Sequence, residues 1–107
     1  MRRAEIYRNG ILAGLLAETD SGKFVFTYDT FYFNDKTKPG ISLTLPKKKL
    51  EYTSNHLFPF FFSMLSEGTN RVVQSKLLKI DENDFFGLLL ATARYDTIGA
   101  ITVMQIK

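Results

Sequence analysis

The stretch HLFPFFFSMLSEGTNR, residues 56–71, can be read as buried core, as a membrane anchor or as a surface for another protein. It predicts a short helix over residues 60–65, because Pro59 suits a first turn and Gly68 suits the position after a last turn. Successive helical residues are rotated by about 100°, so three consecutive phenylalanines and a Met-Leu pair cannot share one buried stripe. We therefore predict that the phenylalanine run is mainly core, with one or two side chains left over, and that residues 65–71 form a presented turn.

Upstream, the spacing of apolar and β-branched residues predicts β-strands over residues 4–8, 11–19, 23–29 and 41–45. Asn9 and Gly10 are predicted to form the turn of a hairpin, because both tolerate a positive φ angle. Gly14 indicates a β-bulge or a close approach of two backbones. Alternation places three aromatic residues on one face of a strand: Phe24, Phe26 and Tyr28. Residues 30–40 are expected to be irregular, because turn-forming residues dominate there.

Downstream, the apolar spacing changes to that of helices. Three helices are predicted, with these caps or starts: Ser54 or Asn55, Thr69 or Asn70, and Asp81, which Asp84 follows three residues on. The apolar stripes of the second and third helices are Val72, Val73, Leu77 and Leu78, then Phe85, Leu88, Leu89 and Thr92. A strand over residues 97–106 is predicted to close the chain.

Together these elements predict a single α+β domain over residues 1–107, with an antiparallel, strand-rich first half, two or three short helices and a closing strand. A chain of 107 residues with 45% hydrophobic residues is long enough to bury a core. No stretch reaches the roughly 20 apolar residues of a membrane span, and no apolar signal segment follows the charged start. We therefore expect a cytoplasmic protein.

The residue inventory argues against catalysis and against a bound cofactor or metal. The chain has no cysteine and one histidine, His56, so a metal site would depend on carboxylates. Neither a phosphate-binding glycine loop nor a nucleophile elbow is present. Helix capping accounts for the acidic residues Asp81, Glu82 and Asp84 better than a carboxylate site does. The expectation is a binding module without enzymatic activity and without a cofactor.

The net charge is +3, and the most concentrated positive run is Lys47, Lys48 and Lys49. Two interpretations stay open for this run. It is either a patch for nucleic acid or an acidic partner, or a solvated loop next to Pro46.

Six segments, taken in order along the chain, resemble the N-terminal subdomain of HipA-type kinase toxins. They are NGILAGLL at residues 9–16, FTYD at 26–29, ISLTLP at 41–46, PFFFSMLSEG at 59–68, DFFGLLLA at 84–91 and DTIGAITV at 96–103. The resemblance implies the α+β fold of that subdomain. Three positions depart from the family's pattern: Ser66 replaces a proline, Thr69 a large aromatic residue and Arg94 a frequent glycine.

The sequence stops where the family's kinase domain would continue, and in this it resembles the HipS-type antitoxins of three-component HipBST systems. The resemblance implies an antitoxin that neutralises a HipA-like (HipT) serine/threonine kinase toxin by direct contact. It also implies a HipB-like DNA-binding protein as a further partner, without a membrane or direct nucleic-acid contact. The alternative is a structural or activating subunit of the kinase complex. On this resemblance the expected partner-binding residues are Met64, Leu65, Ser66, Glu67, Gly68, Thr69, Asn70 and Arg71.

Overall fold

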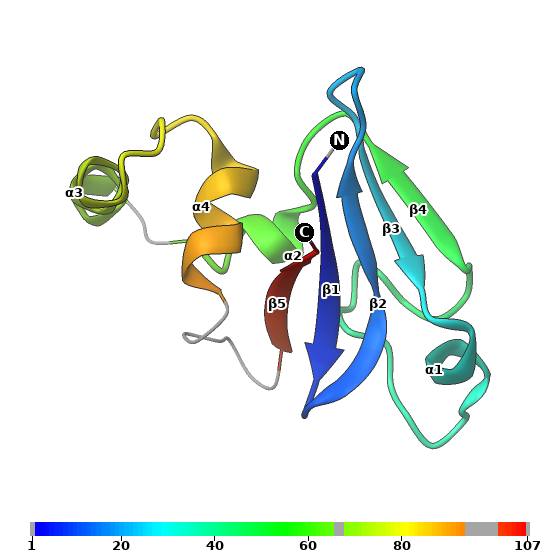
Figure 1. The fold of residues 1–107 in the computed structure, drawn as a ribbon. Coiled ribbons are helices and arrows are strands. Elements are labelled where there is room, and N and C mark those ends of the chain that lie inside the picture. The colour runs from blue at the N-terminus through cyan, green and yellow to red at the C-terminus, as the bar shows by residue number, and fades with distance from the viewer. Residues whose placement is uncertain (1, 66–67, 94–100, 107) are drawn as a thin grey trace.

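A computed structural model describes residues 2–65, 68–93 and 101–106. Its strands are β1 (Arg2–Arg8), β2 (Ile11–Glu18), β3 (Phe24–Tyr28), β4 (Glu51–Ser54) and β5 (Ile101–Ile106). Its helices are α1 (Thr30–Asn34), α2 (Pro59–Phe62), α3 (Gly68–Leu78) and α4 (Phe85–Thr92). The strands form one antiparallel sheet in the order β4-β3-β2-β1-β5, with α2 and α4 packed at one side of it (Figure 1). The predicted α+β class is confirmed.

The β1–β2 hairpin forms as its turn sequence predicts. Asn9 and Gly10 have φ angles of 52° and 78°, the conformation that a two-residue hairpin turn requires. The strand pairing shifts where Ile6 pairs with Gly14 and Tyr7 with Leu12, which marks the expected β-bulge. A Cβ atom on Gly14 would lie 2.5 Å from the carbonyl oxygen of Thr27, so this position also requires a close backbone approach.

The closing strand pairs with the first strand of the chain. β5 lies antiparallel to β1, with Arg3 opposite Ile106 and Arg8 opposite Ile101. The prediction of a closing strand is confirmed over residues 101–106, while residues 97–100 and Arg94 lie outside the described part of the chain. The backbone N–H of Val103 also donates to the carbonyl of Ala93 at 3.1 Å, which ties α4 to the outer edge of β5.

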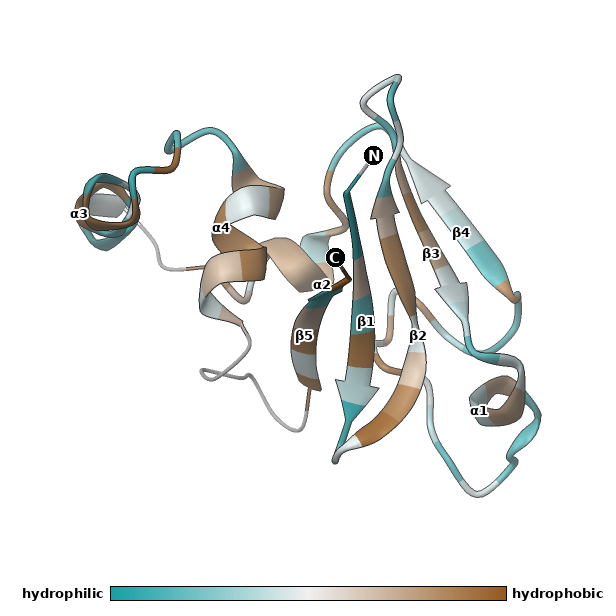
Figure 2. Ribbon diagram, in the orientation of Figure 1, coloured by the Kyte–Doolittle hydropathy of each residue, from teal (hydrophilic) through white to brown (hydrophobic). Residues whose placement is uncertain are grey.

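The core lies between the sheet and the α2–α4 layer. Most of the largest fully buried side chains come from the two sides of this interface: Ile6, Leu16, Phe26, Tyr28 and Val103 from the sheet, and Phe61, Phe86, Leu88 and Leu89 from the helices. Figure 2 shows hydrophobic residues concentrated on α2, α4 and the neighbouring strands. The predicted face of β3 is confirmed, because Phe26 and Tyr28 are buried and Phe24 packs partly buried against the core.

The sequence suggested that residues 30–40 are irregular, but Thr30–Asn34 form helix α1. The carboxylate of Asp29 accepts hydrogen bonds from the backbone N–H groups of Phe31 and Tyr32, at 3.1 and 3.2 Å. This N-cap stabilises a short helix that the surrounding turn residues concealed.

The prediction of a strand over residues 41–45 was wrong, because this segment is a tight turn closed by a bridge between Ser42 and Leu45. The buried hydroxyl of Tyr28 organises it by donating to the carbonyl of Leu45 and accepting from the N–H of Ile41. Burial raises the pKa of Tyr28 to about 12, so this donor stays protonated. Ile41 and Leu45 are consequently buried while Leu43, at the tip, is 100% exposed.

Both predicted boundaries of the first helix were also wrong. Ser54 ends strand β4 instead of capping a helix, and α2 starts after Phe58, which makes no side-chain capping bond. Pro59 does occupy the first turn, as expected. Gly68, predicted to follow the last turn of the first helix, instead begins α3 with a φ angle of 55°.

The third predicted helix forms, with a shifted start and a shifted stripe. Asp84, not Asp81, is its N-cap, because the Asp84 carboxylate accepts from the N–H of Gly87 at 3.1 Å. Leu88 and Leu89 are buried as predicted, but Phe86 takes the buried position that the stripe assigned to Phe85. The side chain of Asp81 accepts from the N–H of Asn83 and so shapes the preceding turn.

Candidate functional site

The phenylalanine run is mainly core, with one ring left over. Phe61 is fully buried, and Phe60 and Met64 pack partly buried against the core. Phe62 is 39% exposed and is the left-over ring that the helical geometry demanded. The run therefore anchors α2 to the sheet and presents a single aromatic side chain outward.

The residues expected to bind a partner differ in their exposure. Leu65 is only 5% exposed and belongs to the core, so it offers little surface to a partner. Gly68, Thr69 and Asn70 are exposed in the first turn of α3. Ser66 and Glu67 lie outside the described residues.

Arg71 joins α3 to the rings of two other helices. Its guanidinium carbon lies 5.4 Å from the ring centroids of both Phe62 and Phe85. These two rings meet edge to face with centroids 5.0 Å apart. Such contacts contribute about 0.5–1 kcal/mol each at exposed sites, so the cluster orients α3 relative to α2 and α4. Sequence spacing gave no signal for it, because the rings come from distant segments.

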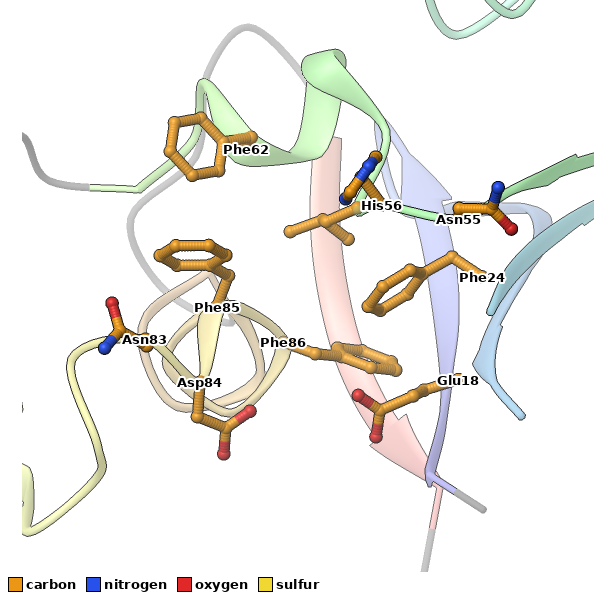
Figure 3. A pocket seen from close by; sticks show the side chains of 10 residues that line it. Glu18, Phe24, Asn55, His56, Phe62, Asn83, Asp84, Phe85 and Phe86 are labelled. Atoms are coloured by element: carbon orange, nitrogen blue, oxygen red, sulfur yellow. The ribbon is translucent and has the colours of Figure 1, made fainter. Parts of the chain in front are cut away.

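The same two rings line a groove of about 310 Å³ between α2, α4 and the end of the sheet. Its walls are apolar and its rim is polar, with this lining: Phe24, Leu57, Phe62, Phe85, Phe86, Glu18, Asn55, His56, Asn83 and Asp84. Figure 3 shows Phe62 and Phe85 on one side of the groove, with Phe24 and Phe86 toward the sheet. An aromatic wall of this kind suits apolar contact better than acid–base chemistry.

The carboxylates at the rim are engaged by Arg2. Its Nη1 and Nη2 atoms donate to the two Asp84 oxygens at 2.9 and 2.8 Å, and its Nε donates to Glu18 at 2.8 Å. The hydrogen bonds from Arg2 hold the pKa of Asp84 below its usual value, against the opposing effect of burial. The guanidinium also lies 5.4 Å from the Phe86 ring centroid. The cluster therefore links β1, β2 and α4 and leaves Asp84 ionised at neutral pH.

Acidification is expected to weaken the fold partly through this ion pair. Because folding lowers the pKa of Asp84, its stabilisation is present above pH 4 and is lost as the pH falls through the folded-state pKa. The contribution is about 1 kcal/mol, because both side chains are roughly one-third exposed. Asp84→Asn, which keeps a capping side chain, should lose less stability than wild type between pH 7 and pH 2 in urea unfolding. An equal acid loss in the two proteins would contradict this assignment.

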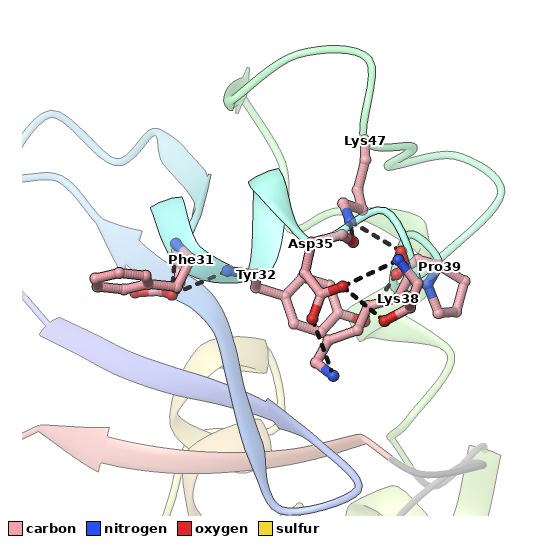
Figure 4. Close-up of polar contacts among 8 residues, drawn as sticks. Phe31, Tyr32, Asp35, Lys38, Pro39 and Lys47 are labelled. Carbon is pink, nitrogen blue, oxygen red and sulfur yellow. Dashed lines mark hydrogen bonds and ion pairs between the residues drawn. The ribbon is translucent and has the colours of Figure 1, made fainter.

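The lysine run is partly used to hold its own loop together. Figure 4 shows the ammonium group of Lys47 donating to the carbonyl oxygens of Asp35 and Lys38, at 2.6 and 2.8 Å. Lys47 also lies 5.1 Å from the ring centroid of Tyr32. The ammonium nitrogen of Lys49 lies 4.7 Å from the ring centroid of Tyr52. These contacts favour the loop interpretation over a patch for nucleic acid.

Within residues 2–65, 68–93 and 101–106, no group of three or more histidine, cysteine, aspartate or glutamate side chains could hold a metal ion. None of the helices in the same part of the chain is long and apolar enough to cross a membrane. The candidate site is therefore a surface: the first turn of α3, the Arg71–Phe62–Phe85 cluster and the groove beside it.

Comparison with known proteins places this surface in a recognised domain. The family model described as "HipA N-terminal domain" matches residues 4–104. A solved structure, the N-terminal domain of HipA toxin, is 28% identical, with a TM-score of 0.76 over 100% of this chain and 94% of that one.

Two curated relatives differ in how much of their length this domain occupies. An uncharacterized protein of Haemophilus influenzae is 30% identical over 107 residues, covering 100% of this chain and 95% of that protein. The putative kinase Y4mE of Sinorhizobium fredii is 25% identical over 89 residues, which are 83% of this chain but 21% of the kinase. The same domain thus occurs both as nearly a whole protein and as a small part of a larger one.

Proposed function

Because this chain belongs to the HipA N-terminal domain family, we propose that it binds a HipA-like serine/threonine kinase toxin of the HipT type and neutralises it. The observation that carries the proposal is the likeness to the N-terminal domain of HipA toxin along the whole chain. The Haemophilus relative, nearly all of which this chain covers, supports a protein in which the domain acts in trans. The proposed activity is binding without catalysis, in a complex that also includes a HipB-like DNA-binding protein.

The proposed mechanism uses the surface at the start of α3. Phosphoryl transfer by kinases depends on accurate positioning of nucleotide, metal ions and catalytic side chains, so a docked domain can inhibit by occupying the cleft or holding the kinase lobes out of register. Thr69 and Asn70 are exposed on the first turn of α3, and Arg71 holds that turn against Phe62 and Phe85. We propose that this turn contacts the kinase, with Glu67 and Met64 as neighbouring contacts.

Co-expression of the chain with the kinase tests the proposal. Wild type should restore growth to cells that produce the kinase and should be captured with it in a pull-down. Thr69→Glu should lose the rescue, because it puts a new charge at the proposed contact while an acidic residue suits the first turn of a helix. Thr44→Glu, on the exposed turn closed by Ser42 and Leu45, is the matched control and should rescue like wild type.

The possible outcomes separate the proposed function from its alternative. If wild type binds the kinase but growth stays arrested, a structural or activating subunit replaces the antitoxin. If wild type does not bind, the kinase proposal is overturned. If Thr69→Glu rescues as well as Thr44→Glu, the antitoxin function stands but its contact surface lies elsewhere.

A further inference from the structure

Helix α3 carries apolar side chains on the side that faces away from the rest of the domain. Val73 and Leu77 lie one turn apart and are 50% and 79% exposed, while the buried residue of the helix is Ser75. Ser75 is two positions from each of them, about 200° around the helix, so Val73 and Leu77 point away from the body of the domain. Figure 2 shows hydrophobic residues on α3, which stands apart from the sheet. We call Val73, Lys76 and Leu77 the outer face of α3; Leu78 lies about 60° from Ser75 around the helix, and Lys79 follows the last turn.

The charged residues of α3 and the residue that follows it, Lys79, are all positive. Lys76 and Lys79 are exposed beside Leu77 and Leu78, and residues 68–80 contain no aspartate or glutamate. A surface of this composition is complementary to an apolar patch rimmed by carboxylates, because like charges opposite each other would oppose docking. Interfacial membrane helices usually add aromatic residues and a longer basic face, which this helix lacks. The chemistry of α3 therefore favours an acidic protein surface over a lipid surface.

The backbone conformation of Lys79 is a second observation about the positive charge at this end of α3. It has a φ angle of 57°, in the left-handed region that favours glycine. Its N–H donates to the carbonyl of Lys76 at 3.3 Å, and the N–H of Ile80 donates to that of Ser75 at 2.9 Å. This bonding pattern ends many helices, usually with glycine where Lys79 stands. A lysine here strains the backbone and places a cation at the C-terminal end of α3, two residues after Leu77.

We propose that the outer face of α3 docks into an apolar patch with an acidic rim on the kinase partner. The inference rests on the proposed function and adds to it the location and chemistry of a second contact. Leu77 is the central anchor, and Lys76 and Lys79 pair with carboxylates at the rim. The first turn of α3 and this face lie on one helix, so both contacts reach the kinase together.

The affinity for a catalytically inactive copy of the kinase tests this docking by titration calorimetry. Leu77→Asp should weaken binding by about 30-fold or more, because it puts a charge at the centre of an apolar contact. Leu43→Asp, at a leucine that is 100% exposed on a different surface, should change affinity by less than about twofold. Unchanged melting temperatures of both variants would show that neither effect reflects unfolding.

The variant Lys79→Gly tests the contribution of the Lys79 charge to binding separately from any effect on stability. Glycine relaxes the positive φ angle, so the variant should melt at the wild-type temperature or above it. It should nevertheless bind the kinase about threefold more weakly and lose affinity less steeply as salt increases, because one cation is gone. Wild-type affinity with a wild-type salt slope in this variant would overturn the role of Lys79.

The remaining outcomes tell this proposal apart from the proposed function. If wild type and Leu77→Asp bind the kinase equally, the outer face is not the contact and the proposed function stands. If wild type does not bind the kinase, both are overturned. Another outcome is that wild type binds phosphatidylserine vesicles, or self-associates in sedimentation, while Leu77→Asp abolishes that binding and leaves kinase affinity unchanged. Such a result would assign the face to lipid or to a second copy.

Discussion

Replacing Phe61 with alanine is expected to lower the free energy of unfolding by about 3–5 kcal/mol, the usual effect of removing a buried phenylalanine. Phe61 is fully buried, and its ring meets those of Phe26 on the sheet, Phe58 and Phe60 at centroid distances of 6.0, 6.4 and 5.2 Å. The substitution would leave a cavity where α2 packs on β3. A loss of this size is a large share of the 5–15 kcal/mol typical of a domain, and should lower Tm by about 15 °C or more.

Phe62→Ala is the matched control for Phe61→Ala. Phe62 is the next residue of the same helix but is 39% exposed, so its loss should reduce stability by about 1 kcal/mol. Part of that loss comes from the contacts with Arg71 and Phe85. Guanidinium unfolding of the two variants measures the difference, and similar losses would mean that α2 does not seat Phe61 in the core as described.

Replacing Gly14 with alanine is expected to destabilise the protein by about 3 kcal/mol, at the upper end of typical overpacking costs. The added Cβ would lie 2.5 Å from the carbonyl oxygen of Thr27 and 2.8 Å from the Phe26 ring. The first of these is backbone, so β2 and β3 would have to separate where Gly14 pairs with Tyr28. The measurement is the unfolding free energy from urea denaturation.

Gly22→Ala is the control for replacing a glycine with alanine where the added Cβ meets no other atom. Gly22 has a φ angle of 84° but no atom within 4 Å of an added Cβ, so its substitution tests backbone conformation without crowding. The expected loss is about 1–2 kcal/mol, from the strain of a left-handed conformation. A loss at Gly14 no larger than the loss at Gly22 would contradict the crowding described for Gly14.

Local sequence signals predicted the fold where the structure depends on neighbouring residues. Asn9 and Gly10 specify a hairpin because the turn needs only their own positive φ angles. The turn at residues 41–45 could not be predicted in this way. Its leucines alternate as in a strand, but the hydroxyl of Tyr28, far along the chain, captures Ile41 and Leu45 and bends the segment.

The candidate site was predictable only in outline. Helical spacing showed that one side chain of the phenylalanine run had to be left over, and Phe62 is that residue. Periodicity also predicted the helix α3, but it could not tell which face the domain covers, and the structure buries Ser75 instead of Leu77. The contact of Arg71 with Phe62 and Phe85 depends on tertiary packing and left no trace in sequence spacing.

The pairing of β5 with β1 has a consequence for how the chain folds as it is synthesised. Arg8 pairs with Ile101 and Arg3 with Ile106, so the interior strand β1 has only β2 beside it until residues 101–106 have left the ribosome. Contacts between residues so distant in sequence slow folding. During that interval the unpaired edge of β1 exposes backbone groups that can pair with another strand. Translation speed and chaperones should therefore influence how much of this protein folds correctly.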